Sequence, residues 1–154
     1  MNILKVGDKV SDFSSLDQHN NTIKLTDFIG KKLIVFFYPR ANTPGCTAQA
    51  CNLRDSYGDL IKEGYSLLGV SADSIKHQKN FSDKFNFPFS LLSDTDHTVI
   101  NIFGVWGPKK FRGKEYDGIN RITFVINENG LIDRVIDKVK TKDHASQILQ
   151  TLSI

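Results

Sequence analysis

Cysteine, methionine, tryptophan and proline are scarce in this chain, whose 154 residues include two cysteines, one methionine, one tryptophan and four prolines. A zinc site needs about four ligands. The four histidines are scattered and show no ligand spacing: His19, His77, His97 and His144. Each is interpreted as a surface or capping residue. The sequence therefore indicates no metal site, and the two cysteines are either inert core thiols or redox groups.

Long apolar runs and a strong excess of one charge are also missing. No segment approaches the roughly 20 apolar residues of a membrane-spanning helix, and residues 1–8 lack the features of a signal peptide. We therefore expect no membrane association and a cytoplasmic location, where permanent structural disulfides are rare. The 20 Lys+Arg against 17 Asp+Glu give a net charge of +3. That excess is too small to indicate nucleic acid, and the basic stretch 109–114 is interpreted as a solvated loop.

The length predicts one domain over residues 1–154, because no repeat, low-complexity tract or linker interrupts the chain. β-rich and alternating patterns predict strands at 10–13, 22–25, 33–38, 65–71, 89–92, 121–127 and 130–138. Helical spacing predicts helices at 46–62, 74–85, 97–103 and 143–152, the last capped by Asp143. The glycine-rich segment 105–118 is expected to be irregular. This order predicts an α/β fold with a central mixed sheet flanked by helices and an N-terminal β-hairpin.

Cys46 lies where local structure favours a reactive thiolate. It follows a loop rich in Asn, Pro and Gly and begins a predicted helix, whose first turn has unpaired N–H groups and a partial positive charge. Such a position stabilises the thiolate, which is the nucleophile. Thr43, three residues earlier, is close enough to bond the sulfur or a bound oxygen, and Pro39 and Pro44 restrict the loop. On these residues reactivity is the preferred interpretation of Cys46, with a buried core thiol as the alternative.

Cys51 is five residues beyond Cys46, and in an α-helix that spacing separates the two Cα atoms by about 8.7 Å. A disulfide needs about 7 Å or less. The two thiols can therefore react with each other only if the first turns of the helix unwind. Taken alone, Cys51 at an interior helix position would be interpreted as a core residue. A thioredoxin-type dithiol has two intervening residues rather than four, and no local signature supports a papain-like Cys–His pair.

The segment Tyr38 to Cys51 resembles the active-site segment of peroxiredoxins. Pro39, Thr43 and Cys46 match the family's Pro-x-x-x-Thr-x-x-Cys pattern, and Cys51 matches the subgroup called bacterioferritin comigratory protein, or peroxiredoxin Q. The similarity continues through 91–94, 103–107 and 116–126. It covers nearly the whole chain, which makes it far more specific than any single motif.

The resemblance implies a thioredoxin-like fold and a thiol-dependent peroxidase that needs no metal or organic cofactor. Cys46 would be oxidised to a sulfenic acid by hydrogen peroxide or an organic hydroperoxide, and Cys51 would resolve it as an intramolecular disulfide. Arg121 corresponds to the arginine that points at the reactive sulfur, and Pro39 shapes the pocket. Thioredoxin is the implied reductant and a monomer the implied state. Gln49 stands where many relatives have Glu, which leaves a carboxylate contact there in doubt.

Three other functions are compatible with the same residues. A redox-regulated binding protein would use the disulfide to switch a surface, with peroxide as a signal rather than a substrate. A protein disulfide oxidoreductase would reduce insulin, although the cysteine spacing and the place of Thr43 speak against it. A structural thioredoxin-like domain would leave both thiols inert.

Overall fold

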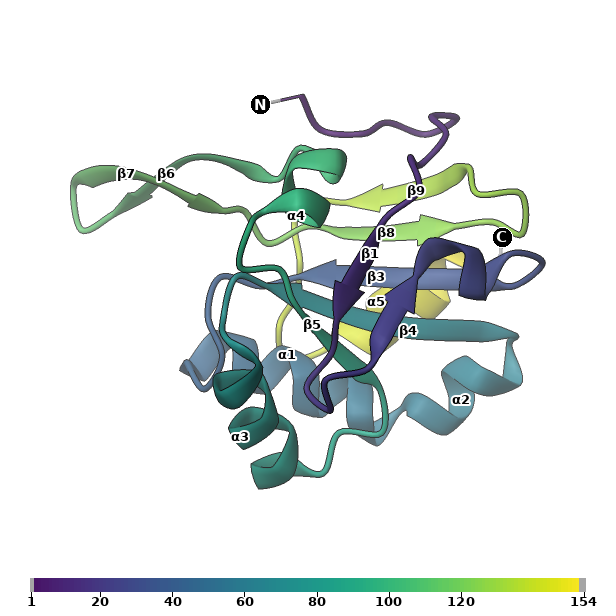
Figure 1. The fold of residues 1–154 in the computed structure, drawn as a ribbon, viewed down its shortest axis with the longest axis horizontal. Helices are drawn as coiled ribbons and strands as arrows, with labels where there is room; N and C mark the ends of the chain where they lie inside the picture. Colours follow the sequence, from purple (N-terminus) through teal and green to yellow (C-terminus); the bar gives the residue numbers. More distant parts are fainter. Residues whose placement is uncertain (1, 153–154) are drawn as a thin grey trace.

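The computed structural model describes residues 2–152, and its centre is a five-stranded mixed sheet with the order β5-β4-β3-β8-β9 (Figure 1). The strands are β3 (Lys32–Phe37), β4 (Tyr65–Ser71), β5 (Ser90–Ser93), β8 (Thr123–Ile126) and β9 (Ile132–Ile136). β3 and β4, and β4 and β5, pair in parallel, whereas β8 runs antiparallel to both β3 and β9. The expected α/β architecture with a mixed central sheet is confirmed.

The central strand β3 separates two apolar clusters because its successive side chains point to opposite faces of the sheet. Leu33, Val35 and Phe37 belong to one cluster, and Ile34 and Phe36 belong to the other. All five are at most 1% exposed. A strand covered on both faces needs apolar residues at every position, which explains its uninterrupted apolar run.

Helices cover the two faces unequally (Figure 1). The face that includes Ile34 is packed by α1 (Pro44–Asp55), α2 (Tyr57–Lys62), α3 (Ile75–Phe85) and α5 (His144–Leu152). The opposite face is packed by α4 (Thr98–Phe103), a 3₁₀ turn at Leu25–Phe28 and residues of the N-terminal segment. No helix within residues 2–152 is both long and apolar enough to cross a bilayer.

Two of the expected elements differ most clearly from those observed. The N-terminal hairpin is present, but its strands are β1 (Ser14–Leu16) and β2 (Thr22–Lys24), so the first begins four residues later than expected. The single helix expected over 46–62 is interrupted at Ser56, whose φ of −107° and ψ of 12° are not helical. Ser56 and Gly58 both favour helices weakly, which is consistent with a break at this point.

The expectation of irregular structure over 105–118 is wrong. β6 (Trp106–Phe111) and β7 (Lys114–Ile119) pair antiparallel as a separate two-stranded sheet that extends away from the central sheet (Figure 1). Arg112 and Gly113 make the turn with φ of 51° and 79°, and two positive values are what a type I′ turn requires. Residues 114–117 are exposed, so no alternation of apolar and polar residues marked these strands.

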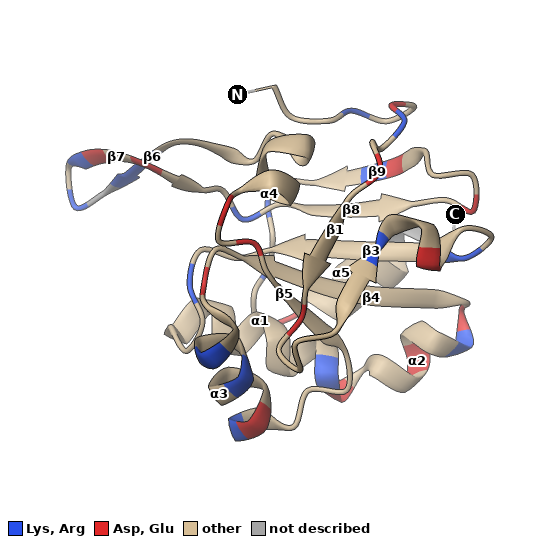
Figure 2. Ribbon diagram, in the orientation of Figure 1, with Lys and Arg blue, Asp and Glu red and all other residues tan. Residues whose placement is uncertain are grey.

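The basic stretch 109–114 is therefore the end of a β-hairpin rather than a loop. Figure 2 shows basic and acidic residues together at this tip and again along α3. Lys110 and Lys114 are exposed, as expected, but Lys109 is half-buried. Its Nζ donates a hydrogen bond of 2.8 Å to the carbonyl of Ile119 on the neighbouring strand.

Gly69 in β4 leaves no room for a side chain. A Cβ at this position would lie 2.7 Å from Leu91 Cδ2 and 2.7 Å from Phe36 Cζ. We expect Gly69→Ala to lower the free energy of unfolding by about 1–3 kcal/mol, because the core must shift to admit it. Urea denaturation would measure the change.

Gly58→Ala in α2 is the matched control, since nothing lies within 4 Å of its added Cβ. It should leave stability unchanged or raise it by about 0.4–1 kcal/mol. Equal urea midpoints for Gly69→Ala and the native chain would contradict the packing argument.

Candidate active site

Cys46 lies in the first turn of α1, directly beyond the loop that follows β3. Thr43 is the N-cap residue, Pro44 takes the first helical position, and Thr47 N–H makes the first helical bond, 2.8 Å to the Thr43 carbonyl. The helix thus begins two residues before its predicted start. The N–H of Cys46 is one of the first-turn N–H groups that have no carbonyl acceptor within the helix. The positive end of the helix therefore lies at this residue.

The sulfur of Cys46 is buried beside a cation. Cys46 is 1% exposed and packs in the apolar cluster under the helices. Arg121 Nη2 lies 3.4 Å from Cys46 Sγ, although the two residues are 75 positions apart. The expected approach of Arg121 to Cys46 is thus present in the structure. The guanidinium of Arg121 therefore brings a fixed positive charge to the sulfur.

Arg121 is held by two features of α1. Its Nη1 donates a hydrogen bond of 2.6 Å to Gln49 Oε1, and Gln49 is fully buried. Gly45 leaves room for the guanidinium, because a Cβ there would lie 3.2 Å from Arg121 Nη2. The Gln49 Nε2 has no hydrogen-bond partner within residues 2–152. Many relatives have Glu at position 49, and the contact to the arginine was in doubt for that reason. Gln49 makes this contact, but through a neutral amide instead of a carboxylate.

The loop between β3 and α1 is fixed by hydrogen bonds at both ends. Ala41 N–H donates 2.8 Å to Asp73 Oδ2, and Thr43 Oγ1 donates 2.8 Å to the Arg40 carbonyl. The hydroxyl of Thr43 thus donates to its own loop. A bond from this hydroxyl to the sulfur of Cys46 was one of the two expected alternatives, and the hydroxyl proton is used elsewhere. A hydroxyl that donates still has lone pairs with which to accept.

A cleft of about 610 Å³ opens above this loop. Its ten described lining residues include Pro39, Arg40 and Thr43 from the loop and Trp106, Lys109, Tyr116, Gly118 and Ile119 from the β6–β7 hairpin. Cys46 and Arg121 are not among them, whereas Pro39 and Thr43 belong to the loop that leads from β3 into the helix of Cys46. Sequence reasoning missed the hairpin wall because it took this segment for an irregular loop.

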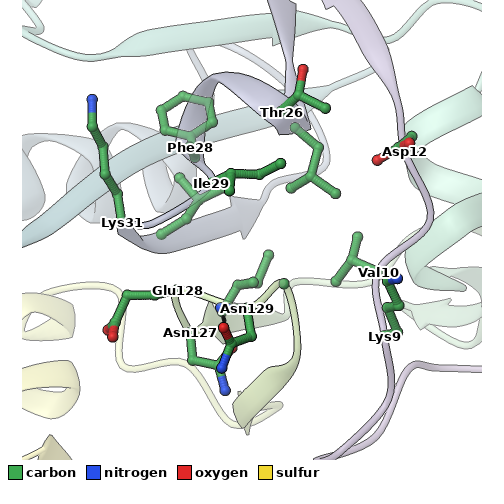
Figure 3. Close-up of a pocket in the computed structure, with 14 residues that line it drawn as sticks. Lys9, Val10, Asp12, Thr26, Phe28, Ile29, Lys31, Asn127, Glu128 and Asn129 are labelled. Atoms are coloured by element: carbon green, nitrogen blue, oxygen red, sulfur yellow. Dashed lines mark hydrogen bonds between the residues drawn. The ribbon is translucent and has the colours of Figure 1, made fainter.

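A second pocket, of about 420 Å³, lies at the opposite end of the sheet (Figure 3). Figure 3 shows Phe28 and Ile29 across from Asn127 and Asn129. Leu33, near the start of β3, also lines it. The strand is about 16 Å long, and Cys46 comes after its other end. This pocket has no thiol in its described lining and is not part of the site around Cys46.

Cys51 lies further along the same unbroken helix and is half-buried. Both cysteines are free thiols. Burial is the main cause that raises the pKa of the Cys51 thiol, while Arg54 lowers it and Asp55 raises it. α1 is helical from Pro44 to Asp55, so the two thiols are too far apart to bond in this state. The structure places Arg121 against Cys46 and sets Pro39 and Thr43 in the loop that leads into α1, and it leaves Cys51 apart.

Two polar residues that sequence reasoning did not single out connect α1 and the sheet to α5. Asn52 Nδ2 donates 3.1 Å to the Lys142 carbonyl, and Asn52 Oδ1 accepts 2.8 Å from Ala145 N–H in the first turn of α5. His144 is fully buried rather than on the surface, with Nε2 2.8 Å from Thr123 Oγ1. Burial lowers the pKa of His144 to about 4, so it is neutral at pH 7. Its position beside an Asp at a helix start gave no signal of burial.

Within residues 2–152, no group of three or more His, Cys, Asp or Glu side chains is placed to hold a metal ion.

Comparison with known proteins assigns the family. Residues 6–135 match the model of the AhpC/TSA family. The chain is 51% identical to "Putative peroxiredoxin bcp" of Haemophilus influenzae, over 99% of this chain and 98% of that one. It is 49% identical to "Peroxiredoxin Bcp" of Escherichia coli, over 99% and 97%. The chain is a peroxiredoxin.

Solved structures agree with this assignment. Xanthomonas campestris peroxiredoxin Q matches with a TM-score of 0.88 and 32% identity, over 98% of this chain and 96% of that one. Peroxidoxin BcpB from Mycobacterium tuberculosis matches with a TM-score of 0.85 and 35% identity, over 97% of each chain. This peroxiredoxin therefore has the thioredoxin-like fold and is a thiol-dependent peroxidase, an oxidoreductase that reduces peroxides at the expense of a reductant.

We expect Arg121→Met to slow the reaction of the enzyme with hydrogen peroxide by about 10²-fold, the scale of one lost donor to a developing negative charge. Methionine keeps the apolar stem but removes the cation 3.4 Å from the sulfur. Stopped-flow fluorescence of the single tryptophan or competition with a second peroxidase would measure the rate.

Lys62→Met, at the exposed end of α2, removes the same charge far from the sulfur and should react like the native chain. An Arg121→Met rate within twofold of the native value would show that the arginine is structural.

Proposed function

We propose that Cys46 is the residue that peroxide attacks. Its thiolate sulfur bonds the terminal oxygen of the hydroperoxide while the O–O bond breaks, so sulfur is oxidised by two electrons and the peroxide is reduced. The leaving oxygen takes a proton and departs as water or an alcohol, and Cys46 becomes a sulfenic acid. The observation that carries this proposal is the 3.4 Å contact between Arg121 Nη2 and Cys46 Sγ at the positive end of α1.

Thr43 and Arg121 would align the peroxide. Thr43 already donates to the Arg40 carbonyl, so it serves best as an acceptor for the peroxide O–H. The guanidinium can stabilise both the thiolate and the charge that develops on the oxygens. Pro39 shapes the floor of the cleft and takes no part in bond making.

Cys51 would resolve the sulfenic acid. Its thiolate attacks the Cys46 sulfur, the S–O bond breaks, the hydroxide takes a proton and leaves as water, and an intramolecular disulfide forms. This step needs α1 to open, since the intact helix holds the Cα atoms about 8.7 Å apart. Opening also exposes Cys51 to water, which removes the burial that raises the pKa of its thiol. One rearrangement therefore supplies both the approach and the reactive form of the second thiol.

A dithiol would then reduce the disulfide by exchange, and we propose thioredoxin as that reductant. The related enzymes support a peroxidase with a reductant without naming which one. Because both cysteines belong to one helix, the cycle needs no second subunit, and we propose that the chain acts as a monomer.

Oxidation should open α1. With one equivalent of hydrogen peroxide, we expect amide exchange over residues 46–55 to rise and far-UV helical signal to fall, because the Cys46–Cys51 disulfide is incompatible with the helix. The two hydrogen bonds from Asn52 to α5 should be lost at the same time.

Cys51→Ser is the control for this experiment, since it forms the sulfenic acid but no intramolecular disulfide and should keep its protection. Equal protection in the reduced and oxidised native chain would contradict the opening of α1.

Turnover tests the whole proposal. With thioredoxin, thioredoxin reductase, NADPH and hydrogen peroxide, the native chain should consume NADPH continuously. Cys46→Ser should abolish peroxide consumption, and Cys51→Ser should consume about one equivalent and then stop. Normal turnover by Cys51→Ser would remove that residue from its role.

The same measurement separates the competing function. One disulfide for each peroxide with no turnover by any dithiol would favour a redox-switch binding protein. Insulin reduction would favour a disulfide oxidoreductase.

A further inference from the structure

Asp73 contacts the loop between β3 and α1, although it belongs to a different part of the chain. It follows β4 by two residues and precedes Ser74, the N-cap residue of α3. β3 and β4 are parallel neighbours, so the segments that leave their carboxyl ends emerge at the same edge of the sheet. This topology brings the carboxylate of Asp73 to the backbone of Ala41, 32 residues earlier in the chain.

One oxygen of this carboxylate holds the middle of the loop. Asp73 Oδ2 accepts a hydrogen bond of 2.8 Å from Ala41 N–H and another of 2.7 Å from Ser71 Oγ. Ala41 is buried and belongs to the same apolar cluster as Cys46. A buried amide that loses its acceptor costs free energy. The bond therefore favours the one course of the loop in which Ala41 meets the carboxylate.

The backbone of the loop turns sharply at the next residue. Asn42 has a φ of 64°, in the left-handed region that residues with a side chain rarely adopt. Such conformations persist where surrounding contacts fix them. Thr43, the N-cap residue of α1, follows directly, and its hydroxyl donates back to the Arg40 carbonyl. The bond from Ala41 to Asp73 thus lies two residues before the hydroxyl that would accept the peroxide O–H.

Asp73 is itself held by a network of buried side chains. Ser71 Oγ accepts 2.8 Å from Gln78 Nε2, and Gln78 Oε1 accepts 2.5 Å from the hydroxyl of Tyr38. Burial raises the pKa of Tyr38, so this hydroxyl keeps its proton and donates. Ser71 and Gln78 are fully buried. The network therefore leaves the loop at Tyr38 and returns to it at Ala41, and Asp73 supplies its charge.

We propose that Asp73 is a positioning residue for the reaction with peroxide. Through Ala41 N–H it fixes the course of the loop, and thereby the place of the Thr43 hydroxyl relative to the Cys46 sulfur. The reaction depends on that place, because a misplacement of about 1 Å can slow a reaction by about 10²-fold. This inference rests on the proposed attack of peroxide on Cys46 and adds a residue that acts on it through the backbone.

Variants in a Cys51→Ser background test this inference, because Cys46 is then the only thiol of a chain with two cysteines. Rapid quench and mass spectrometry would give two rates for Cys46: with hydrogen peroxide, which needs alignment, and with iodoacetamide, which does not. Asp73→Ala should slow the peroxide reaction by about 10-fold to 100-fold without slowing alkylation. Asp73→Asn should keep the peroxide rate within about threefold of the parent, since an amide oxygen can accept both hydrogen bonds.

Asp83→Ala is the matched control, since it removes the same charge from the exposed surface of α3 and should keep both parent rates. Asp73→Ser is a second variant that keeps a polar side chain at this position. Its hydroxyl is one bond too short to reach Ala41, so it should lose peroxide reactivity as Asp73→Ala does. Far-UV circular dichroism would show that each variant is folded.

Three results would overturn the role of Asp73. The first is a peroxide rate within about twofold of the parent in folded Asp73→Ala or Asp73→Ser. The second is equal slowing of both reactions, since the change would then act on the thiol and not on the alignment of peroxide. The third is an equal loss in Asp73→Asn and Asp73→Ala, which would assign the effect to charge. A parent chain that forms no sulfenic acid with hydrogen peroxide would instead overturn the proposed function.

Discussion

A guanidinium 3.4 Å from a buried sulfur is the contact on which the arrangement of this site depends. Arg121 comes just before β8 and Cys46 just after β3, and these strands are antiparallel neighbours. The hydrogen bond of 3.0 Å from Phe37 N–H to the Ile122 carbonyl ties the two segments at that end of the sheet. A half-buried cation needs partners, and Gln49 supplies one from the same helix that holds the sulfur.

Helix α1 has two opposed tasks. Its intact first turn places Cys46 against Arg121, and its unwinding would allow Cys51 to approach. The side chain of Asn52 bonds to the start of α5, so opening past this residue also removes partners from another helix. A helix that must open belongs among the less stable parts of a fold. Its interruption at Ser56 limits how far such an opening need extend.

The β6–β7 hairpin gives the cleft its chemical character. It contributes aromatic rings and an inward-directed lysine, while the loop after β3 contributes Pro39 and Thr43. The central sheet and α1 position the sulfur, but the wall beside it is built from a segment that makes no pairing with the central sheet. The cleft wall and the Cys46–Arg121 contact therefore come from different parts of the fold.

The sequence by itself determined the elements whose pattern is local. The apolar run over 33–38 identified the central strand, and the Pro-Gly loop before Cys46 placed that thiol at a helix start, because periodicity and turn residues act over a few positions. The spacing to Cys51 excluded a disulfide in the intact helix. Only the tertiary structure decided what depends on distant segments: the hydrogen bond from Arg121 to Gln49, the burial of His144 and the inward course of Lys109. The hairpin over 106–119 was missed because residues 114–117, which are exposed on both faces of the strand, have no apolar period to detect.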